Sequence, residues 1–505
     1  MNIAEHVERA ARRAPDHAAI LFEGKVLTYG VLDSCASALA DSLIKHDVHR
    51  GDRVALYLPN IPAFALAYVA IQKVGAVAVS INSIFKQEEV RYIVNDSRPR
   101  VLFTTAELLP NVPRPHCPSI EHTVLCEGAE PDEIALERWL EKGSPSFRAN
   151  NMQPDDPAAL LYSSGTTGFP KGATLTHNNI VTNIRTAAKY SGYRTQDRLA
   201  CFLPLFHVFA QNYIMNGCFE AGATMVLFRR FVPDDVLSAV HRQKITMFFA
   251  VPTIYIALLN TELAKYDLSS IRYEFSAAAT MPQEISRRWT ERFGRPIYEG
   301  YGLTECSPFA AYNHLTSHRF GSVGTAVENF EIRIFDEHDQ QAPLGEWGEI
   351  VIRGPGVMKG YWGKPEETDR ALRGGWLHSG DIGRMDEDGY VYIVDRVKDM
   401  INVSGFKVWP AEVEHTLYRH PAVKEIAVYG APDPTKGEHV RAAIVLKEGH
   451  RATEDEIVQY CRDHLAVYKA PAKVEFVKEL PKSATGKILK RVLRDRAASE
   501  GATGR

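Results

Sequence analysis

The sequence predicts an α/β protein with a large N-terminal domain of parallel sheets, a β-rich subdomain and a small α+β domain at the end. Three patterns along the 505 residues lead to this class. Apolar runs typical of strands alternate with amphipathic stretches, short alternating strands follow them, and compact mixed elements close the chain. A chain of this length can bury more than one core, so we expect at least two domains.

Strand, helix and strand follow one another twice, after an amphipathic helix over Val31–Lys45. The apolar face of that helix holds Leu32, Cys35, Leu39 and Leu43. The first series is Arg53–Leu58, Pro62–Gly75 and Ala76–Ile81. The second series is Ala223–Phe228, Val236–Arg242 and Thr246–Val251. This order favours a parallel sheet, because the helix returns the chain to the edge where the first strand began.

The pattern changes between Gly321 and Arg353. Strands with alternating apolar residues, Glu331–Phe335 and Glu349–Arg353, are separated by turn-forming segments over Asp336–Gln341 and Pro343–Gly345. Short alternating strands joined by turns are typical of antiparallel structure. We therefore expect an antiparallel subdomain beside the parallel sheets.

After Asp395 the elements become short and mixed, and the chain ends in a basic, polar tail. We place the large domain at residues 1–395 and the small domain at residues 396–505, with the boundary near Arg396–Lys398. No Gly/Ser linker marks this boundary.

Composition and charge exclude several classes of protein. The formal charge of −3 provides neither a basic surface for nucleic acid nor a polybasic segment for an anionic membrane. The longest apolar run, Ala63–Ile71, is too short to span a bilayer, and the N-terminus lacks the apolar core of a secretory signal. Seven cysteines without a C-x-x-C pair fit reduced thiols. We expect a cytoplasmic protein without stable membrane insertion.

The loop within Leu160–His177 is rich in glycine and hydroxyl side chains and contains one lysine. Its anion-binding candidates are Ser163, Ser164, Gly165, Thr166, Thr167, Gly168 and Lys171. Small residues allow successive backbone N–H groups to face one anion, hydroxyls add donors, and the lysine adds positive charge. The loop differs from the common P-loop, because Pro170 precedes the lysine and Gly172 follows it. A polyphosphate is the expected ligand.

This loop, YSSGTTGFPKG, resembles the signature of the adenylate-forming superfamily, which includes acyl-CoA synthetases, luciferases and adenylation domains of peptide synthetases. Further motifs of that superfamily follow in the same order over nearly the whole chain. They are Tyr298–Glu305, Ser379–Asp381, Val394–Asp399, Ser404–Lys407 and Pro481–Lys487. The chain is most similar to bacterial medium- and long-chain fatty acyl-CoA synthetases. The resemblance implies that ATP activates a carboxylic acid as acyl-AMP with release of pyrophosphate, before coenzyme A accepts the acyl group and AMP leaves.

The resemblance also assigns roles to residues of the nucleotide site. Glu305 would bind Mg²⁺ and Thr304 would contact a phosphate or acyl oxygen, which agrees with the preference of a hard cation for carboxylates. Tyr301 would stack on adenine, and Glu299 and Gly300 of the same motif would belong to the nucleotide site.

Two further residues resemble the ribose-binding pair of the superfamily. Asp381 would accept hydrogen bonds from both ribose hydroxyls, which suits a carboxylate, and Arg396 would also hold the ribose. Neither assignment would stand without the surrounding motifs.

The C-terminal motifs imply a mobile small domain. Lys487 would contact the carboxylate and the α-phosphate during adenylation, where an ammonium group neutralises developing charge. Lys398 matches the hinge position, about which the small domain would rotate between half-reactions. After rotation, the loop Ser404–Lys407 would approach the acyl group, with Gly405 beside the path of coenzyme A.

The acid itself is less well defined. His207 lies where adenylation domains for amino acids carry an aspartate, so an amino acid substrate is not expected, and His207 becomes a candidate site residue. Phe206, Phe209 and Tyr213 follow as candidates for an apolar acyl pocket or for plain core. The segment Ser276–Thr280, SAAAT, has alanines where members of the superfamily often have glycines, and their methyl groups would narrow such a pocket. We expect a linear fatty acid, with an aryl acid as the alternative.

Other functions remain to be compared with this one. A fatty acyl-AMP ligase would deliver the acyl group to a carrier protein, but the chain contains no obvious extra segment of the kind that such ligases carry. A luciferase would need oxygen chemistry that no residue here demands. A non-catalytic scaffold would not need Lys171, Glu305, Asp381 and Lys487 together. The sequence leaves the pathway and the oligomeric state open, a homodimer included.

Overall fold

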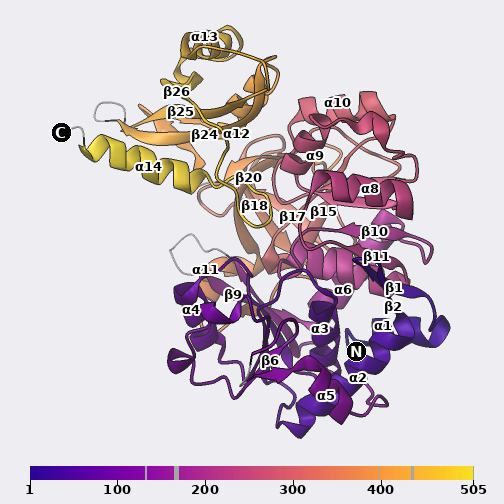
Figure 1. The fold of residues 1–505 in the computed structure, drawn as a ribbon. Coiled ribbons are helices and arrows are strands. Elements are labelled where there is room, and N and C mark those ends of the chain that lie inside the picture. The colour runs from indigo at the N-terminus through magenta and orange to yellow at the C-terminus, as the bar shows by residue number, and fades with distance from the viewer. Residues whose placement is uncertain (131–132, 164–169, 397–398, 434–436, 504–505) are drawn as a thin grey trace.

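The computed structural model describes residues 1–130, 133–163, 170–396, 399–433 and 437–503. Two large sheets and the helices around them form the bulk of the protein, and a smaller antiparallel sheet adjoins them (Figure 1). A further sheet with its own helices forms the C-terminal part, which stands apart at the upper left of Figure 1. The expected α/β class is confirmed.

The first large sheet contains the first strand–helix–strand series that the sequence predicts. Among the described residues its strands, in spatial order, are β19 (Gly360–Tyr361), β9 (Lys171–Thr176), β8 (Pro157–Ser163), β4 (Val77–Ser80), β3 (Arg53–Leu56), β5 (Val101–Thr104), β6 (His122–Leu125) and β7 (Ile134–Ala135). The strands from β8 to β7 are parallel, whereas β9 and β19 are antiparallel to their neighbours. The strand–helix–strand series over β3 and β4 is therefore confirmed as a parallel pair.

The second large sheet is also mainly parallel. Its strands are β16 (Thr325–Ala326), β15 (Phe309–Tyr312), β14 (Tyr298–Gly302), β13 (Tyr273–Ser276), β12 (Met247–Ala250), β10 (Arg198–Cys201), β11 (Thr224–Leu227), β1 (Ala18–Phe22) and β2 (Lys25–Thr28). Strands β11 and β12 do not pair with each other, because β10 lies between them and is parallel to both. The sequence analysis had not identified β10.

Helices cover and separate these sheets. Those of the N-terminal part are α1 (Glu5–Arg13), α2 (Tyr29–Lys45), α3 (Pro62–Val74), α4 (Gln87–Ser97), α5 (Leu136–Lys142), α6 (His177–Ser191), α7 (Gly217–Ala221), α8 (Pro233–Gln243), α9 (Pro252–Leu259), α10 (Gln283–Phe293) and α11 (Pro365–Ala371). Helix α2 begins two residues before the predicted start, because the Thr28 side chain accepts a hydrogen bond from Val31 N and caps it. A π-helix, η3 (Phe209–Asn216), is buried along its whole length.

The predicted antiparallel subdomain is present. It contains β17 (Glu331–Phe335), β18 (Gly348–Arg353), β20 (Leu377–Met385) and β21 (Val391–Arg396), and each strand is antiparallel to its neighbour. Phe335, Val351 and Trp376 form a small core of their own on this sheet.

The C-terminal part mixes short strands and helices. Its elements are β22 (Ile401–Val403), β23 (Phe406–Val408), α12 (Pro410–Leu417), β24 (Val423–Asp433), β25 (Gly437–Leu446), α13 (Glu454–His464), β26 (Lys473–Phe476) and α14 (Lys490–Thr503). Strands β24 and β25 are antiparallel, and β26 runs parallel to β25. The hinge candidate Lys398 lies outside the described residues, so the domain boundary stays a prediction.

Within the described residues, none of the helices combines the length and the apolar character that crossing a bilayer requires.

A buried lysine forms ion pairs that connect helices α1, α2 and α3. The Lys73 side chain on α3 is fully buried, and its Nζ lies 2.7 Å from Glu8 Oε1 on α1 and 2.7 Å from Asp33 Oδ1 on α2. Burial opposes ionisation of Glu8, but the hydrogen bonds from Lys73 and Ala149 N together with the positive charges of Lys73 and Arg148 outweigh it and lower the pKa of that carboxyl. Buried charges persist only when they are paired, so this triad fixes the packing of three helices.

Replacing Lys73 by methionine (K73M) is expected to reduce the free energy of unfolding by about 3–5 kcal/mol, because two carboxylates lose their shared cation. Urea unfolding followed by tryptophan fluorescence at neutral pH measures the change. The lowered pKa of Glu8 stabilises the fold above the ordinary pKa of glutamate, and this contribution is lost as the pH falls through the lowered value. The difference between K73M and wild type should therefore shrink in acid.

The matched control is K45M, which removes an exposed ion pair between Lys45 and Asp41 on α2. Exposed pairs of this kind contribute about 0.5 kcal/mol or less. If K73M lowers the free energy of unfolding no more than K45M does at neutral pH, the buried triad does not stabilise the packing of α1.

Candidate active site

The candidate residues lie at strand ends and turns of three sheets. Ser163 ends β8 and Lys171 begins β9, while Glu305 lies in the short 3₁₀ helix η5 (Thr304–Cys306) just after β14. Asp381 lies on β20 and Arg396 ends β21. Ligands of α/β sheets generally bind beyond the carboxyl ends of the strands, and Ser163 and Glu305 lie at those ends of β8 and β14.

Glu305 is held by hydroxyl groups from the first sheet. Its Oε1 accepts hydrogen bonds from Ser163 Oγ and from Tyr361 Oη, each at 2.9 Å. Glu305 itself is buried, and Thr304 beside it is half-buried. An ionised carboxylate accepts more bonds than these two, so Glu305 retains capacity for a hard cation. The donor set fits Mg²⁺, which takes one or two carboxylates together with phosphate oxygens and waters.

Lys171 faces a carboxylate and an aromatic ring. Its Nζ forms an ion pair with Glu367 on α11 and lies 5.3 Å from the centre of the Tyr361 ring. The hydrogen bond from Lys171 lowers the pKa of Glu367. An anionic phosphate at Lys171 would compete with Glu367 for the ammonium group. The rest of the predicted phosphate loop, Ser164, Gly165, Thr166, Thr167 and Gly168, lies outside the described residues.

The residues predicted to bind the nucleoside contact one another at Asp381. Tyr301 Oη donates a hydrogen bond to Asp381 Oδ2 at 2.8 Å, and Arg396 Nε lies 3.1 Å from Asp381 Oδ1. Burial, reinforced by the charge of Asp381, raises the pKa of Tyr301 well above its ordinary value, so the hydroxyl keeps its proton. The antiparallel register of β20 and β21 pairs Asp381 with Arg396 and thereby sets this contact.

The residues before Tyr301 are packed inside β14. A Cβ added to Gly300 would lie 2.6 Å from the Phe275 ring, which explains the glycine. The Glu299 carboxyl is buried, and burial raises its pKa to about 8 although the Met281 backbone N–H donates to it. Glu299 is therefore mostly protonated at neutral pH.

The C-terminal loop that contains Lys487 lies against the large sheets. Thr253 Oγ1 on α9 donates a hydrogen bond to Gly486 O at 2.9 Å. Burial and the positive charge of Lys487 lower the pKa of His207 to about 4, so the two side chains are near each other and His207 is neutral at pH 7. The His207 Nδ1 accepts a hydrogen bond from Phe209 N at 3.3 Å, at the start of η3.

Gly405 is not part of this arrangement. It is exposed in the turn between β22 and β23 at φ +90°, and an added Cβ would have no other described heavy atom within 4 Å. The structure therefore places Lys487 near His207 and leaves Ser404–Lys407 exposed.

The sequence analysis missed Tyr361 and Glu367 as neighbours of the site. Both lie in the segment GYWGKPEET, which contributed to the resemblance without any assigned role. Pairing of β19 with β9 brings Tyr361 opposite Ala173, and only this long-range pairing shows the contact.

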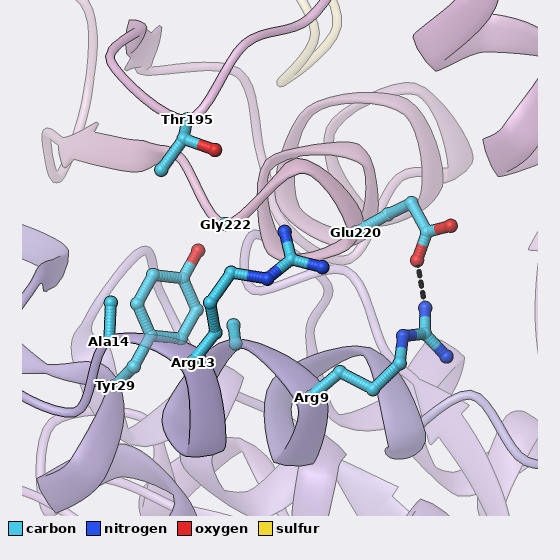
Figure 2. Close-up of a pocket in the computed structure, with 8 residues that line it drawn as sticks. Arg9, Arg13, Ala14, Tyr29, Thr195, Glu220 and Gly222 are labelled. Atoms are coloured by element: carbon cyan, nitrogen blue, oxygen red, sulfur yellow. Dashed lines mark hydrogen bonds and ion pairs between the residues drawn. The ribbon is translucent and has the colours of Figure 1, made fainter.

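A separate cavity between α1 and α7 takes no part in the site. Its volume is about 30 Å³, enough for about one water molecule. Arg9, Arg13, Tyr29 and Glu220 are among the residues that line it, and Arg9 forms an ion pair with Glu220 (Figure 2). None of the candidate residues lines this cavity.

Comparison with known proteins identifies the family. The model of the AMP-binding enzyme family matches residues 7–362, and that of the AMP-binding enzyme C-terminal domain matches residues 412–487. A long-chain-fatty-acid–CoA ligase of Bacillus subtilis (strain 168) is 37% identical over 96% of this chain and 92% of its own length. A feruloyl-CoA synthase of Amycolatopsis sp. is 37% identical over 97% of each chain.

Solved structures of similar fold also include CoA ligases. The anthranilate CoA ligase AuaEII in complex with anthranoyl-AMP is 32% identical, with a TM-score of 0.94 over 99% of this chain and 98% of its own. ATP-bound MatB from Rhodopseudomonas palustris is 31% identical, with a TM-score of 0.91 over 98% of this chain and 99% of its own. The chain belongs to the AMP-binding enzyme family, and within the adenylate-forming superfamily it is an acyl-CoA synthetase, an AMP-forming acid–thiol ligase.

Proposed function

We propose that this synthetase joins an apolar carboxylic acid, a fatty acid in the first instance, to coenzyme A through an acyl-AMP intermediate. The observation that carries the proposal is the nearness of Lys487 to His207, just before η3, whose residues Asn212 and Phe209 contact the segment that follows Glu305. Activation brings two anions together, and cationic side chains at their meeting point stabilise the charge that develops.

Five of the candidate residues have these tasks in the first half-reaction of the proposal. The acid's carboxylate oxygen attacks the α-phosphorus of ATP, and the bond to pyrophosphate breaks. Lys487 neutralises charge between carboxylate and α-phosphate, and Lys171 exchanges Glu367 for a phosphate oxygen. Asp381 and Arg396 hold the ribose, while the ring of Tyr301 stacks on adenine.

Magnesium has one proposed protein ligand among the described residues, Glu305, which Ser163 and Tyr361 orient. The ion would neutralise charge on the phosphates of ATP. In the second half-reaction the coenzyme A thiolate attacks the acyl carbonyl carbon and AMP leaves. We propose that residues 1–395 and 396–505 rotate about Lys398 to bring Gly405 to the acyl group at that stage, and the separate family matches to the two parts support this division.

The choice of a fatty acid rests on the long-chain relatives and on the apolar surroundings of His207. Phe209 and Tyr213 on η3 are buried in a cluster with Phe249, Phe275 and Phe309. An aryl acid is the second candidate, because this cluster presents aromatic rings and a feruloyl-CoA synthase is equally similar. A carrier protein as acceptor remains the alternative to coenzyme A.

Replacing Lys487 by alanine (K487A) is expected to reduce adenylate formation by at least about 100-fold, because the charge between carboxylate and α-phosphate is lost. Thioester formation from synthetic acyl-AMP and coenzyme A should be unchanged. Pyrophosphate release and thioester yield measure the two half-reactions separately. The control is K482A, since Lys482 lies on the same loop but pairs with Glu425 at 2.9 Å. Equal loss in both half-reactions of K487A would contradict a role confined to adenylation.

Removing the Tyr361 hydroxyl (Y361F) is expected to raise the Mg²⁺ concentration for half-maximal pyrophosphate release about 10-fold, because groups that orient a metal ligand tune its affinity. Binding of Mn²⁺ with ATP, followed by electron paramagnetic resonance, gives a readout independent of turnover. Y390F serves as control, since the Tyr390 hydroxyl donates to Ser317 O at 2.7 Å away from Glu305. An unchanged metal requirement in Y361F would show that Glu305 does not need this bond.

Assays of pyrophosphate release across fatty acids of graded length, cinnamic acids and benzoic acids are expected to give turnover that needs both an acid and coenzyme A. A maximum among linear acids supports the proposed substrate, and a maximum among aryl acids replaces it with the second candidate. A single burst of adenylate that ignores coenzyme A would indicate a carrier-protein acceptor.

A further inference from the structure

The segment that presents Asp381 is a bulge in β20. Strand β18 pairs regularly until Glu349 faces Ile382 and Val351 faces His378, so residues 379–381 stand opposite the single residue Ile350. Gly380 in this bulge has φ +71°, a conformation that favours glycine. Bulges redirect side chains next to functional sites, and here the bulge ends at the residue that contacts Tyr301 and Arg396.

Glu349 fastens this bulge to the sheet. Its Oε1 accepts a hydrogen bond from Gly380 N at 2.9 Å, and its Oε2 lies 2.8 Å from His378 Nδ1. Ser379 Oγ donates to Ile350 O at 2.6 Å on the same strand. One carboxylate thus holds the residue before the bulge and the glycine inside it.

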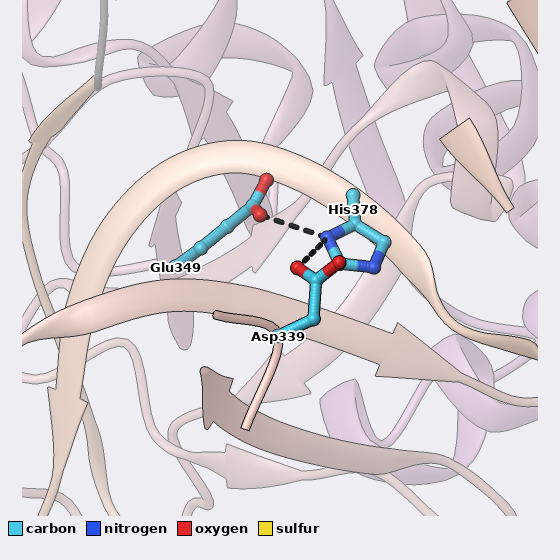
Figure 3. A group of neighbouring side chains, drawn as sticks. All are labelled: Asp339, Glu349 and His378. Atoms are coloured by element: carbon cyan, nitrogen blue, oxygen red, sulfur yellow. Dashed lines mark hydrogen bonds and ion pairs between the residues drawn. The ribbon is translucent and has the colours of Figure 1, made fainter. Parts of the chain in front are cut away.

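The neighbourhood of Glu349 has the composition of a metal site, but it already contains a cation. Asp339, Glu349 and His378 lie close together (Figure 3). Arg373 lies 2.8 Å from Asp339 Oδ2 through Nε and 3.5 Å from Glu349 Oε2 through its terminal nitrogen. The guanidinium balances both carboxylates, so we infer no metal here.

We propose that Glu349 is a positioning residue for the nucleotide site: it fixes the bulge at Gly380 so that Asp381 faces the ribose hydroxyls. The inference rests on the proposed role of Asp381 in binding ATP. Without the Glu349 carboxylate the Gly380 N–H loses its acceptor and the glycine regains conformational freedom, so Asp381 loses one of the restraints that direct it toward Tyr301; Ser379 and the pairing with Arg396 remain. Asp339 bonds to Arg373 and lies 3.9 Å from His378 Nδ1, but its partners lie outside residues 379–381, so its loss should not affect Asp381.

The test compares E349A with E349D, E349Q, D339A and D381N in the full chain. A displacement assay with a fluorescent ATP analogue gives the dissociation constant for ATP, and steady-state assays give KM for ATP and for the acid. E349A is expected to weaken ATP binding about 10-fold, as loss of one charge-assisted hydrogen bond does, with KM for the acid unchanged. E349D keeps the charge beside Arg373 but is one methylene too short to reach Gly380 N, so it should weaken ATP binding even if E349A does not fold.

Two variants should leave ATP binding within about 2-fold of wild type. In E349Q the amide oxygen still accepts from Gly380 N, and in D339A the bulge is untouched. The inference is overturned if D381N weakens ATP binding while E349A and E349D do not, if D339A weakens it as much as E349A, or if KM for ATP and for the acid rise together. If D381N itself leaves ATP binding unchanged, the proposed ribose contact is wrong and the inference falls with it.

Discussion

Hydrogen bonds between different sheets hold the candidate active site in shape. Glu305, between β14 and β15 of the second large sheet, is held by Ser163 and Tyr361 of the first, and Asp381 of the antiparallel sheet is held by Tyr301 of the second. Each bond joins a functional carboxylate to a neutral hydroxyl, which orients the charge without cancelling it. The relative placement of three sheets therefore sets the distance between Glu305, the proposed metal ligand, and Asp381, the proposed ribose ligand.

The two candidate lysines, Lys171 and Lys487, have different neighbours. Lys171 is paired with Glu367, and Lys487 lies near a histidine that burial keeps neutral. A lysine in an ion pair must exchange one anion for another when a phosphate binds. Under the proposed function, binding of a phosphate at Lys171 is consequently a competition with Glu367.

Local motifs in the sequence marked the candidate residues, and the predicted parallel and antiparallel sheets are present. Lys171, Glu305, Asp381 and Lys487 were recognisable because glycine, hydroxyl and charged residues surround them in fixed order. Tyr361, Glu367 and Glu349 were not recognisable, since their contacts depend on strand pairings between segments far apart in the chain. Strand β10 was missed for a similar reason, because only the observed order shows that it separates β11 from β12.

The π-helix η3 allows the surroundings of His207 to change by chain length as well as by substitution. A π-helical turn contains one residue more than an α-helical turn, so deleting a single residue from Phe209–Asn216 would allow the α-helical register to return. Such a deletion would change which side chains of Phe209–Asn216 pack in the aromatic cluster with Phe249, Phe275 and Phe309. Because the proposed function takes this cluster as apolar surroundings of the acid, a change of chain length at η3 would alter the choice of acid in one step.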